Sequence, residues 1–318
     1  MLRASGLSSR SALVLQNHDL LSCGPLARGA SLRQWRALRQ RYLRSVFFDD
    51  LPTFLFSREP RDLLTNLPVL RRAQKVVFWL GTGLIDQLLV SWLVGEAEVI
   101  GADPRDFRVM QFHRHGMRGY DILSIAILNP DDLRELAQGV EATPIDVDET
   151  RAAWEAVTSP EPDQLVGFCS RSSTQLSLLK SALVTLLRRY PDARTGLNFW
   201  DYELLKYCGE VGPRAVRVVG HTMGSNMETP DWPGDSYLFA RLRRLGDSRL
   251  RHPLVRFSGR LSRIRSAEVS LTDVGSDVLA GRANPVTLNG IDDWVGGVHL
   301  DSSAGRVWFH QDGRLTVT

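Results

Sequence analysis

The stretch Lys75–Val94, KVVFWLGTGLIDQLLVSWLV, decides the expected fold of the first half of the chain. Val76–Leu80 is an apolar run typical of a buried strand, Gly81–Gly83 predicts a tight turn, and Leu84–Val94 has the polar spacing of a helix. A strand, a glycine turn and a helix in this order bring backbone N–H groups to the carboxyl edge of a sheet, where α/β proteins usually bind ligands. We therefore expect four ligand-binding residues: Gly81, Thr82, Gly83 and Gln87.

The same turn departs from the dinucleotide-binding fingerprint. Asp86 occupies the position of the third glycine, and its negative charge at the start of the helix would repel a diphosphate. The alternative is that Gly81 and Gly83 allow close packing of the helix on the strand. The cofactor therefore remains unknown at this point.

Strands and helices alternate in the first half of the chain. The pattern predicts strands at Ala12–Leu15, Val76–Leu80, Glu98–Ile100 and Ile122–Leu128, and helices at Ser31–Arg44, Leu84–Val94 and Asn129–Gln138. Such alternation favours a mostly parallel sheet with right-handed crossovers. We expect an α/β domain over residues 1–147, built as a mostly parallel three-layer sheet, with an irregular segment at Gly101–Met117.

Residues 148–318 are expected to form a mainly helical second domain. Helices are predicted at Glu149–Val157, Thr174–Arg189, Phe199–Cys208, Pro213–Gly220, Asp235–Leu245 and Thr272–Ala280, with an antiparallel pair at Leu254–Phe257 and Ala267–Leu271. The order helix, helix, helix, strand pair and helix at about 196–281 is that of a winged-helix module. Residues 282–318 are expected to dock on the body as a tail.

Charge is distributed unevenly, although the formal net charge of the 318 residues is only +3. Between Tyr237 and Arg265 there are nine arginines and one acid, Asp247. In a winged-helix interpretation Ser236–Leu245 is the recognition helix and Gly259–Arg265 the wing tip. The residues expected to contact nucleic acid are Arg241, Arg243, Arg244, Arg260, Arg263 and Arg265. The alternatives are a solvated basic face, or a module used only for packing or dimerisation.

Two carboxylates follow predicted strands. Asp19 and Asp86 would lie at the same sheet edge, where they could bind Mg²⁺ or act as a catalytic acid and base. The alternatives are that Asp19 caps the following turn and that Asp86 stabilises the first turn of its helix. No metal site is predicted from the three cysteines, which have neither zinc nor disulfide spacing.

A cytoplasmic protein without a membrane partner is expected. The start, MLRASGLSSRSALVL, lacks the apolar core of a signal peptide, and no apolar run reaches the ~20 residues that span a bilayer. The widely spaced cysteines suit a reducing compartment. The oligomeric state is not predicted.

Several motifs carry a resemblance over nearly the whole chain. They are DLLSCGPL at 19–26, Trp79 with LIDQL at 84–88, RAAW at 151–154, SPEP at 159–162, RYPD at 189–192, GDS at 234–236, LTD at 271–273 and LNGIDDWVGGVHL at 288–300. The chain resembles a bacterial family known only as domain of unknown function eighteen-thirty-five. The resemblance implies no activity.

The chain departs from this family at two places. Relatives usually begin with an extra strand leading into a Gly-Asp-Ser turn. Either Met1 is a late start, which we favour, or this version of the protein lacks one strand of the sheet. Many relatives have Glu-His-Asp where this chain has Gly81-Thr82-Gly83, so any chemistry of those groups is lost here.

Taken together, the sequence favours a cytoplasmic regulator that senses a small ligand or partner through its α/β domain and contacts nucleic acid through its winged helix. The alternatives are a metal-assisted hydrolase or transferase that uses Asp19 and Asp86, and a non-catalytic scaffold.

Overall fold

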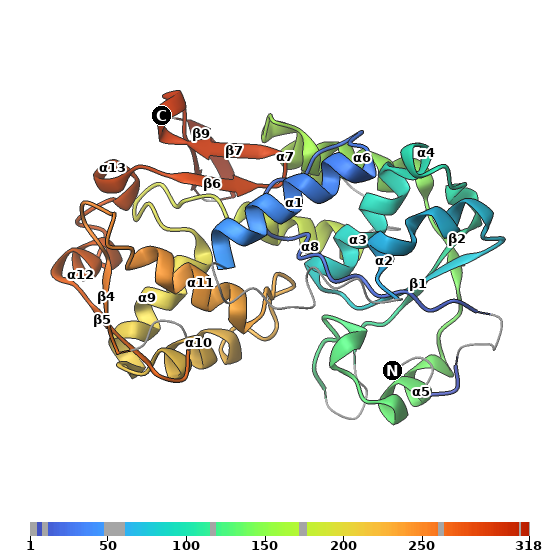
Figure 1. The fold of residues 1–318 in the computed structure, drawn as a ribbon, viewed down its shortest axis with the longest axis horizontal. Coiled ribbons are helices and arrows are strands. Elements are labelled where there is room, and N and C mark those ends of the chain that lie inside the picture. Colours follow the sequence, from blue (N-terminus) through green and yellow to red (C-terminus); the bar gives the residue numbers. More distant parts are fainter. Residues whose placement is uncertain are drawn as a thin grey trace.

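The computed structural model describes residues 5–7, 12–47, 61–114, 119–171, 177–259, 264–311 and 313–317. Figure 1 shows the first half of the chain on the right, the module at about 196–281 on the left, and the C-terminal hairpins above them. Helix α1 (Leu32–Phe47) runs diagonally from one half to the other and contacts α11 (Asp235–Leu245). The two halves are therefore joined by a packed helix.

The first half contains short strands among helices. Its elements are α1, α2 (Leu63–Asn66), η3 (Leu67–Arg72), β1 (Val76–Leu80), α3 (Leu84–Gly95), α4 (Ala97–Ile100), η4 (Pro104–Asp106), β2 (Phe107–Gln111), η5 (Ile125–Ile127), α5 (Pro130–Ala137) and β3 (Thr143–Pro144). The predicted strand β1 and the helices α1, α3 and α5 are confirmed. Asn129 accepts hydrogen bonds from the first turn of α5, as its position before Pro130 indicates.

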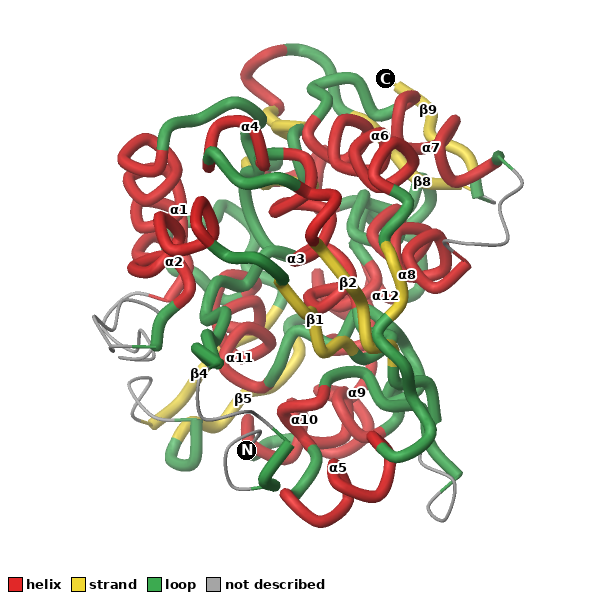
Figure 2. The backbone as a smooth tube through the Cα atoms, turned by 90° about the vertical axis from the view of Figure 1, so that its right-hand side faces the viewer, coloured by secondary structure: helices red, strands yellow, loops and turns green. Residues whose placement is uncertain are grey.

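The sheet of this half is small and mixed. It has the order β1-β2-β3, with β1 and β2 parallel from Val76↔Phe107 to Leu80↔Gln111, and the two-residue β3 antiparallel to β2. Figure 2 shows β1 and β2 side by side near the middle of the view. The chain is thus mixed α/β, but the prediction of a mostly parallel three-layer sheet is wrong.

Three predicted strands are absent from this sheet. Ala12–Leu15 has no strand pairing, and only the adjacent Gln16 forms a bridge, with Asp62. Glu98–Ile100 lies in the short helix α4, and Ile122–Leu128 contains η5. An apolar run of a few residues has too few positions to separate a period of two from 3.6, which explains these errors and the missed strand β2.

The second half begins with helices that share the core of the first. These are α6 (Val147–Thr158), α7 (Asp163–Ser170) and α8 (Ser177–Leu187). One hydrophobic cluster includes Trp92 of α3, Trp154 of α6 and Leu183 of α8. Because α3 is apolar around most of its circumference, it is covered on several sides.

A separate hydrophobic cluster holds the next elements together. They are α9 (Phe199–Val211), α10 (Ala215–Gly224), α11, β4 (Val255–Gly259), β5 (Ala267–Leu271) and α12 (Asp273–Leu279). The three helices, the antiparallel pair and the closing helix occur in the predicted order. The caps are also as expected, since Asn198 and Thr272 each accept a hydrogen bond from the helix that follows.

The chain ends in two small hairpins. After α13 (Pro285–Asn289) come β6 (Asp292–Val295), β7 (Val298–Asp301), η6 (Ser302–Ala304), β8 (Trp308–Gln311) and β9 (Arg314–Val317). The N–H of Gly297 donates to the carbonyl of Val157 at 2.8 Å, and a Cβ at Gly297 would lie 2.1 Å from the carbonyl oxygen of Thr158. Glycine is needed there because the turn of the first hairpin touches the end of α6.

Among the described residues, no helix has the length and apolar character to cross a membrane.

Candidate functional site

The glycine turn after β1 is closed by other parts of the protein. Each of its four consecutive N–H groups donates to an internal acceptor: Gly81 to Asp86 Oδ2 at 2.8 Å, Thr82 to the carbonyl of Ile122 at 2.7 Å, Gly83 to that of Leu123 at 2.8 Å, and Leu84 to that of Pro230 at 2.8 Å. An anion could use these groups only by displacing their present acceptors.

The glycines allow this closure. A Cβ at Gly81 would lie 2.3 Å from the carbonyl oxygen of Ile122, and one at Gly83 would lie 2.4 Å from that of Leu123. The segment Ile122–Leu123 therefore occupies the space above the turn. Ligand binding at this edge stays a prediction that requires the segment to move.

Gln87 lies under the turn together with a residue that the sequence did not single out. Gln87 Nε2 donates to the carbonyl of Gly81 at 2.8 Å and to Gln111 Oε1 at 3.0 Å, and Gln111 Nε2 donates to the carbonyls of Leu80 and Gly81. The two amides tie the ends of the parallel strands together. The signal for Gln111 was hidden because β2 itself was not predicted.

Asp86 is a largely buried carboxyl group among neutral donors. It accepts hydrogen bonds from the N–H of Gly81 and, at 3.2 Å, from Ser124 Oγ. Burial raises the pKa of Asp86 to about 6 despite these hydrogen bonds. The group can therefore exchange a proton close to neutral pH.

Asp19 has a different kind of partner. Both of its carboxylate oxygens accept from Arg39, with Nη2 to Oδ1 at 2.8 Å and Nε to Oδ2 at 3.1 Å, and both side chains are buried. Arg39 also donates to the carbonyls of Leu20, Cys23 and Pro25. The ion pair fastens the 19–25 loop to α1, and it occupies the oxygens that a metal ion would need.

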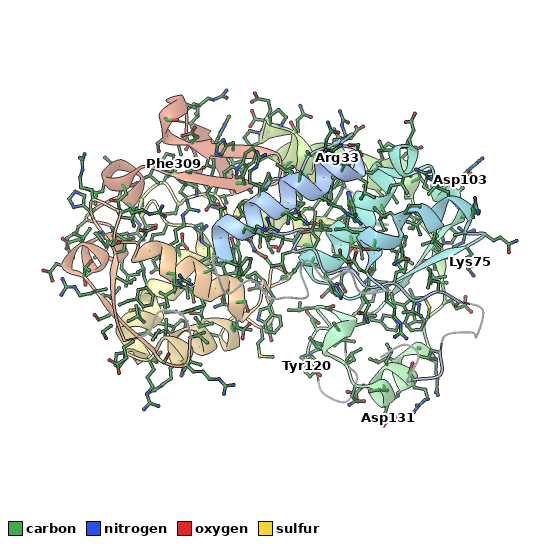
Figure 3. All side chains as sticks on the ribbon, viewed as in Figure 1. Arg33, Lys75, Asp103, Tyr120, Asp131 and Phe309 are labelled. Carbon is green, nitrogen blue, oxygen red and sulfur yellow. The ribbon has the colours of Figure 1, made fainter. Side chains whose placement is uncertain are left out.

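Arg39 is a residue that the sequence analysis did not single out. It lies four residues after Trp35 and four before Leu43, on the buried face of α1, whereas Arg33 on the same helix is exposed (Figure 3). An arginine at the spacing of apolar residues was the available signal. Across the described parts of the chain, no group of three or more His, Cys, Asp or Glu side chains is placed to hold a metal ion.

The arginines expected to contact nucleic acid lie in different environments. Arg265 is exposed and Arg243 is half-buried, while Arg260 and Arg263 lie outside the described residues. Arg241 is only 6% exposed. Its Nε and Nη2 donate to the two carboxylate oxygens of Asp201, and its Nη1 donates to Asp293 Oδ2. Arg241 is therefore an internal ion-pair partner, which corrects its expected place at the surface.

Most of helix α11 is covered. Seven of its side chains are buried, and Tyr237 packs against Phe47 of α1 with ring centroids 6.5 Å apart. Figure 1 shows α1 lying against α11. In this arrangement the helix expected to enter a DNA groove is an interior element.

A second buried arginine extends the polar interior. Arg189 binds Asp231 through Nε and Nη2, both at 2.7 Å, and its Nη1 donates to Tyr237 Oη at 2.9 Å. Asp231 also accepts from Trp200 Nε1 at 3.0 Å. Burial outweighs the other influences on Tyr237 and raises the pKa of its hydroxyl. These charges were unpredictable individually because their partners lie far away in sequence.

Asp293 shows how the arginines act on a carboxylate. Burial raises its pKa, but the nearby charges of Arg241 and Arg244, with hydrogen bonds, outweigh burial and lower the pKa to about 2. Arg244 is 40% exposed, donates to the carbonyl of Asp292, and lies 3.5 Å from Asp293 Oδ2. Asp293 therefore stays ionised throughout the neutral range.

A cavity of about 370 Å³ opens beside this network, and we call it the junction cavity. Its walls come from the end of α8, α9, α11, the 250–254 loop and the tail. The charged and amide side chains that line it are Arg189, Asn198, Asp201, Arg241, Arg244, Asn289, Asp292 and Asp293. Residues 289–293, which belong to the 288–300 motif of the resemblance, supply one wall.

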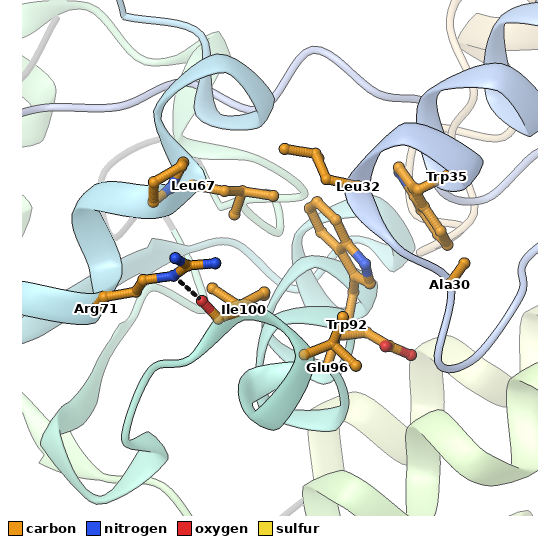
Figure 4. Close-up of a pocket in the computed structure, with 10 residues that line it drawn as sticks. Ala30, Leu32, Trp35, Leu67, Arg71, Trp92, Glu96 and Ile100 are labelled. Carbon is orange, nitrogen blue, oxygen red and sulfur yellow. Dashed lines mark hydrogen bonds between the residues drawn. The ribbon is translucent and has the colours of Figure 1, made fainter.

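A second cavity, of about 60 Å³, is lined by tryptophans (Figure 4). Trp35 and Trp92 stack with centroids 5.0 Å apart, and Arg71 Nε donates to the carbonyl of Ile100 at 2.7 Å, the contact dashed in Figure 4. Small-molecule sites usually measure roughly 300–1,000 Å³. This space is too small for such a ligand, whereas the junction cavity falls within the range.

No family model matches the chain, and no curated protein matches it. The resemblance found in the sequence stays a prediction.

Proposed function

We propose that this protein is a ligand-responsive regulator that binds a small polar molecule in the junction cavity. The observation that carries the proposal is the cavity of about 370 Å³ whose walls hold fixed charges of both signs. Sites for small molecules combine a concave shape with a few oriented polar groups. Here Asp201 and Asp293 hold Arg241 in place before any ligand arrives.

The mixture of charges favours a zwitterion, with a free α-amino acid as the simplest class. Of the three arginines that line the cavity, Arg244 is the least buried. Its guanidinium group can turn toward the carboxylate of a ligand. Asp292 is 81% exposed on its side chain and bonds only the half-exposed His299 among the described side chains, so it can accept from an ammonium group. A purely anionic ligand would meet Asp201, Asp292 and Asp293.

The position of the cavity supports a regulatory role. The 197–283 cluster forms one side, and α13 with β6 forms the other. Asn289 bonds both the N–H and the carbonyl of His252, each at 2.9 Å, so hydrogen bonds already join the two sides. Suppose that the two sides can adopt two relative arrangements. A ligand that contacts both sides and binds one arrangement more tightly would shift the equilibrium toward that arrangement.

The module itself is winged-helix-like in this proposal. Its support is the order of α9, α10, α11, β4, β5 and α12, together with a third pairing in which Arg214 forms a bridge with Glu268 of β5. Because α11 is covered by α1, we assign the module to packing and ligand binding. A cytoplasmic location remains part of the proposal.

The test is a thermal-shift screen of free amino acids, monosaccharides and nucleosides against wild type and Val286→Phe, which places a ring in the cavity. We expect amino acids to raise the Tm of wild type only. At a ligand concentration of one hundred times Kd, the stabilisation free energy is about 2.7 kcal/mol. No stabilisation by amino acids, or equal stabilisation of the variant, would overturn the proposal.

Nucleic-acid contact is a second candidate function, supported by the exposed arginines Arg256 and Arg265 at the β4–β5 hairpin. Contacts of this kind weaken steeply with salt. A gel-shift series in 50 to 200 mM salt should show binding by wild type that Arg256→Ala/Arg265→Ala reduces and Arg33→Ala does not. Absence of binding at the lowest salt concentration would eliminate this candidate.

A further inference from the structure

A third cavity, of about 250 Å³, lies on the other side of the Leu197–Asn198 segment from the junction cavity, and we call it the Arg188 cavity. Its remaining lining residues are Arg188, Tyr190, Asp192, Arg194, Thr195, Phe199, Tyr202 and His310. The site involves none of the residues predicted from the sequence to bind a ligand or nucleic acid.

Two consecutive arginines line different cavities, Arg189 the junction cavity and Arg188 the Arg188 cavity. Arg189 is 6% exposed and is bound to Asp231, as described above. The Arg188 guanidinium carbon lies 3.5 Å from the centre of the Phe199 ring. A guanidinium stacked on a ring keeps its N–H edge available for a bidentate acceptor.

The cations of this cavity exceed its carboxylates. Within the part of the chain that the structure describes, neither Arg188 nor Arg194 forms an ion pair. Asp192 is the one carboxylate among the lining residues, and its Oδ1 accepts from the N–H groups of Arg194 and Thr195 and from Thr195 Oγ1. Burial lowers the pKa of Arg188, although the charges of Asp231 and Glu203 act in the opposite direction, and a bound anion would stabilise the charged form further.

The first turn of α9 adds to the same polarity. Asn198 caps this 13-residue helix, and Phe199 is its first residue, so the positive end of the helix lies at the cavity wall. The stacked guanidinium, the second arginine and the start of α9 therefore line one space.

We propose that the Arg188 cavity binds the phosphate group of a small phosphate ester. Arg188 supplies the bidentate contact and Arg194 a second cation. The rings of Phe199 and Tyr202 provide an apolar wall for the organic part of the ester. The proposal is independent of amino-acid binding in the junction cavity.

Isothermal titration calorimetry with inorganic phosphate and with phenyl phosphate tests this site. We expect both to bind wild type, phenyl phosphate more tightly because of the two rings. Arg188→Gln should weaken binding at least ~10-fold, since it removes a charged hydrogen-bond donor. Arg188→Lys, which keeps the charge but loses the bidentate contact, should weaken it ~2–10-fold.

Two controls separate this site from general charge attraction and from the junction cavity. Arg33→Gln removes an equal charge from an exposed position and should leave affinity within about twofold. Val286→Phe should also leave phosphate affinity unchanged. The proposal fails if wild type binds neither compound, if Arg33→Gln weakens binding as much as Arg188→Gln, or if Val286→Phe alone abolishes it. If Arg188→Gln does not fold, unchanged affinity in Arg188→Lys overturns the proposal.

Discussion

Asp86 and Asp293 are two sheltered carboxyl groups with opposite electrostatics. Asp86 at the sheet edge meets only neutral donors, and burial raises its pKa to about 6. At Asp293 burial also raises the pKa, but Arg241 and Arg244 outweigh it and lower the value to about 2. The comparison shows that hydrogen bonds from an amide and a hydroxyl do not replace solvation for a carboxylate, whereas two guanidinium groups do.

The same contrast distinguishes the two parts of the protein. At the glycine turn the backbone is closed by the Ile122–Leu123 segment, and no cation faces Asp86 among its hydrogen-bond partners. At the junction cavity the charges are paired across segments that are distant in sequence, and space remains beside them. We infer that the glycine turn shelters a carboxyl group that titrates near neutral pH, whereas the junction cavity holds oriented charges for a ligand.

Removing the cation from the paired region should have the largest effect. Arg241→Met leaves Asp201 and Asp293 buried without their main partner, and breaking such a pair costs ~3–5 kcal/mol. Urea denaturation at neutral pH measures this loss. Arg33→Met on the surface of α1 should stay within about 0.5 kcal/mol. A loss below about 1 kcal/mol for Arg241→Met would mean that Asp201 and Asp293 are solvated. The contrast between a paired carboxylate at Asp293 and an unpaired one at Asp86 would then be wrong.

The contribution of Asp86 to the free energy of unfolding should depend on pH. Asp86 has a folded-state pKa of about 6 and a reference value of 3.8, so its contribution to stability is fully present below pH ~4 and is lost as pH rises through 6. A shift of about two units corresponds to about 3 kcal/mol. The stability difference between Asp86→Asn and wild type should change by that amount in favour of the variant from pH 4 to pH 7.

Unfolding free energies at these pH values provide the measurement, with Asp131→Asn as the control because Asp131 is exposed (Figure 3). Asp293 has the opposite sign. Its depressed pKa contributes stability that is present above pH ~4 and lost as pH falls through 2. A flat difference for Asp86→Asn between pH 4 and 7 would show that the carboxyl is solvated like Asp131.

Local signals were sufficient to predict most helices of this chain. Asn198 and Thr272 cap the helices that follow them, and the β4–β5 pair and α11 lie where their patterns indicate. These features depend on residues three or four positions apart. The sheet was less predictable, because three-residue segments such as Glu98–Ile100 fit either period and because β2 carries polar residues.

The site depended on long-range pairing, which one sequence does not reveal. Arg241 meets carboxylates 40 and 52 positions away, and Arg39 meets one 20 positions away. A run of arginines has the same composition whether its members face solvent or enter the core. The spacing of Arg39 among apolar residues was the one local sign of burial, and it extends the rule for apolar faces to paired charges.

The smallest of the three effects tests whether the glycine turn is truly closed. Gly81→Ala brings a Cβ within 2.3 Å of the carbonyl oxygen of Ile122, and overpacking of this kind costs ~1–3 kcal/mol. Gly167→Ala in α7, where nothing lies within 4 Å, should be neutral or stabilise by up to about 1 kcal/mol. Thermal denaturation of both variants measures the difference. If Gly81→Ala is as stable as wild type, the Ile122–Leu123 segment can move away at little cost in free energy. The glycine turn would then be a place where a ligand can reach Asp86.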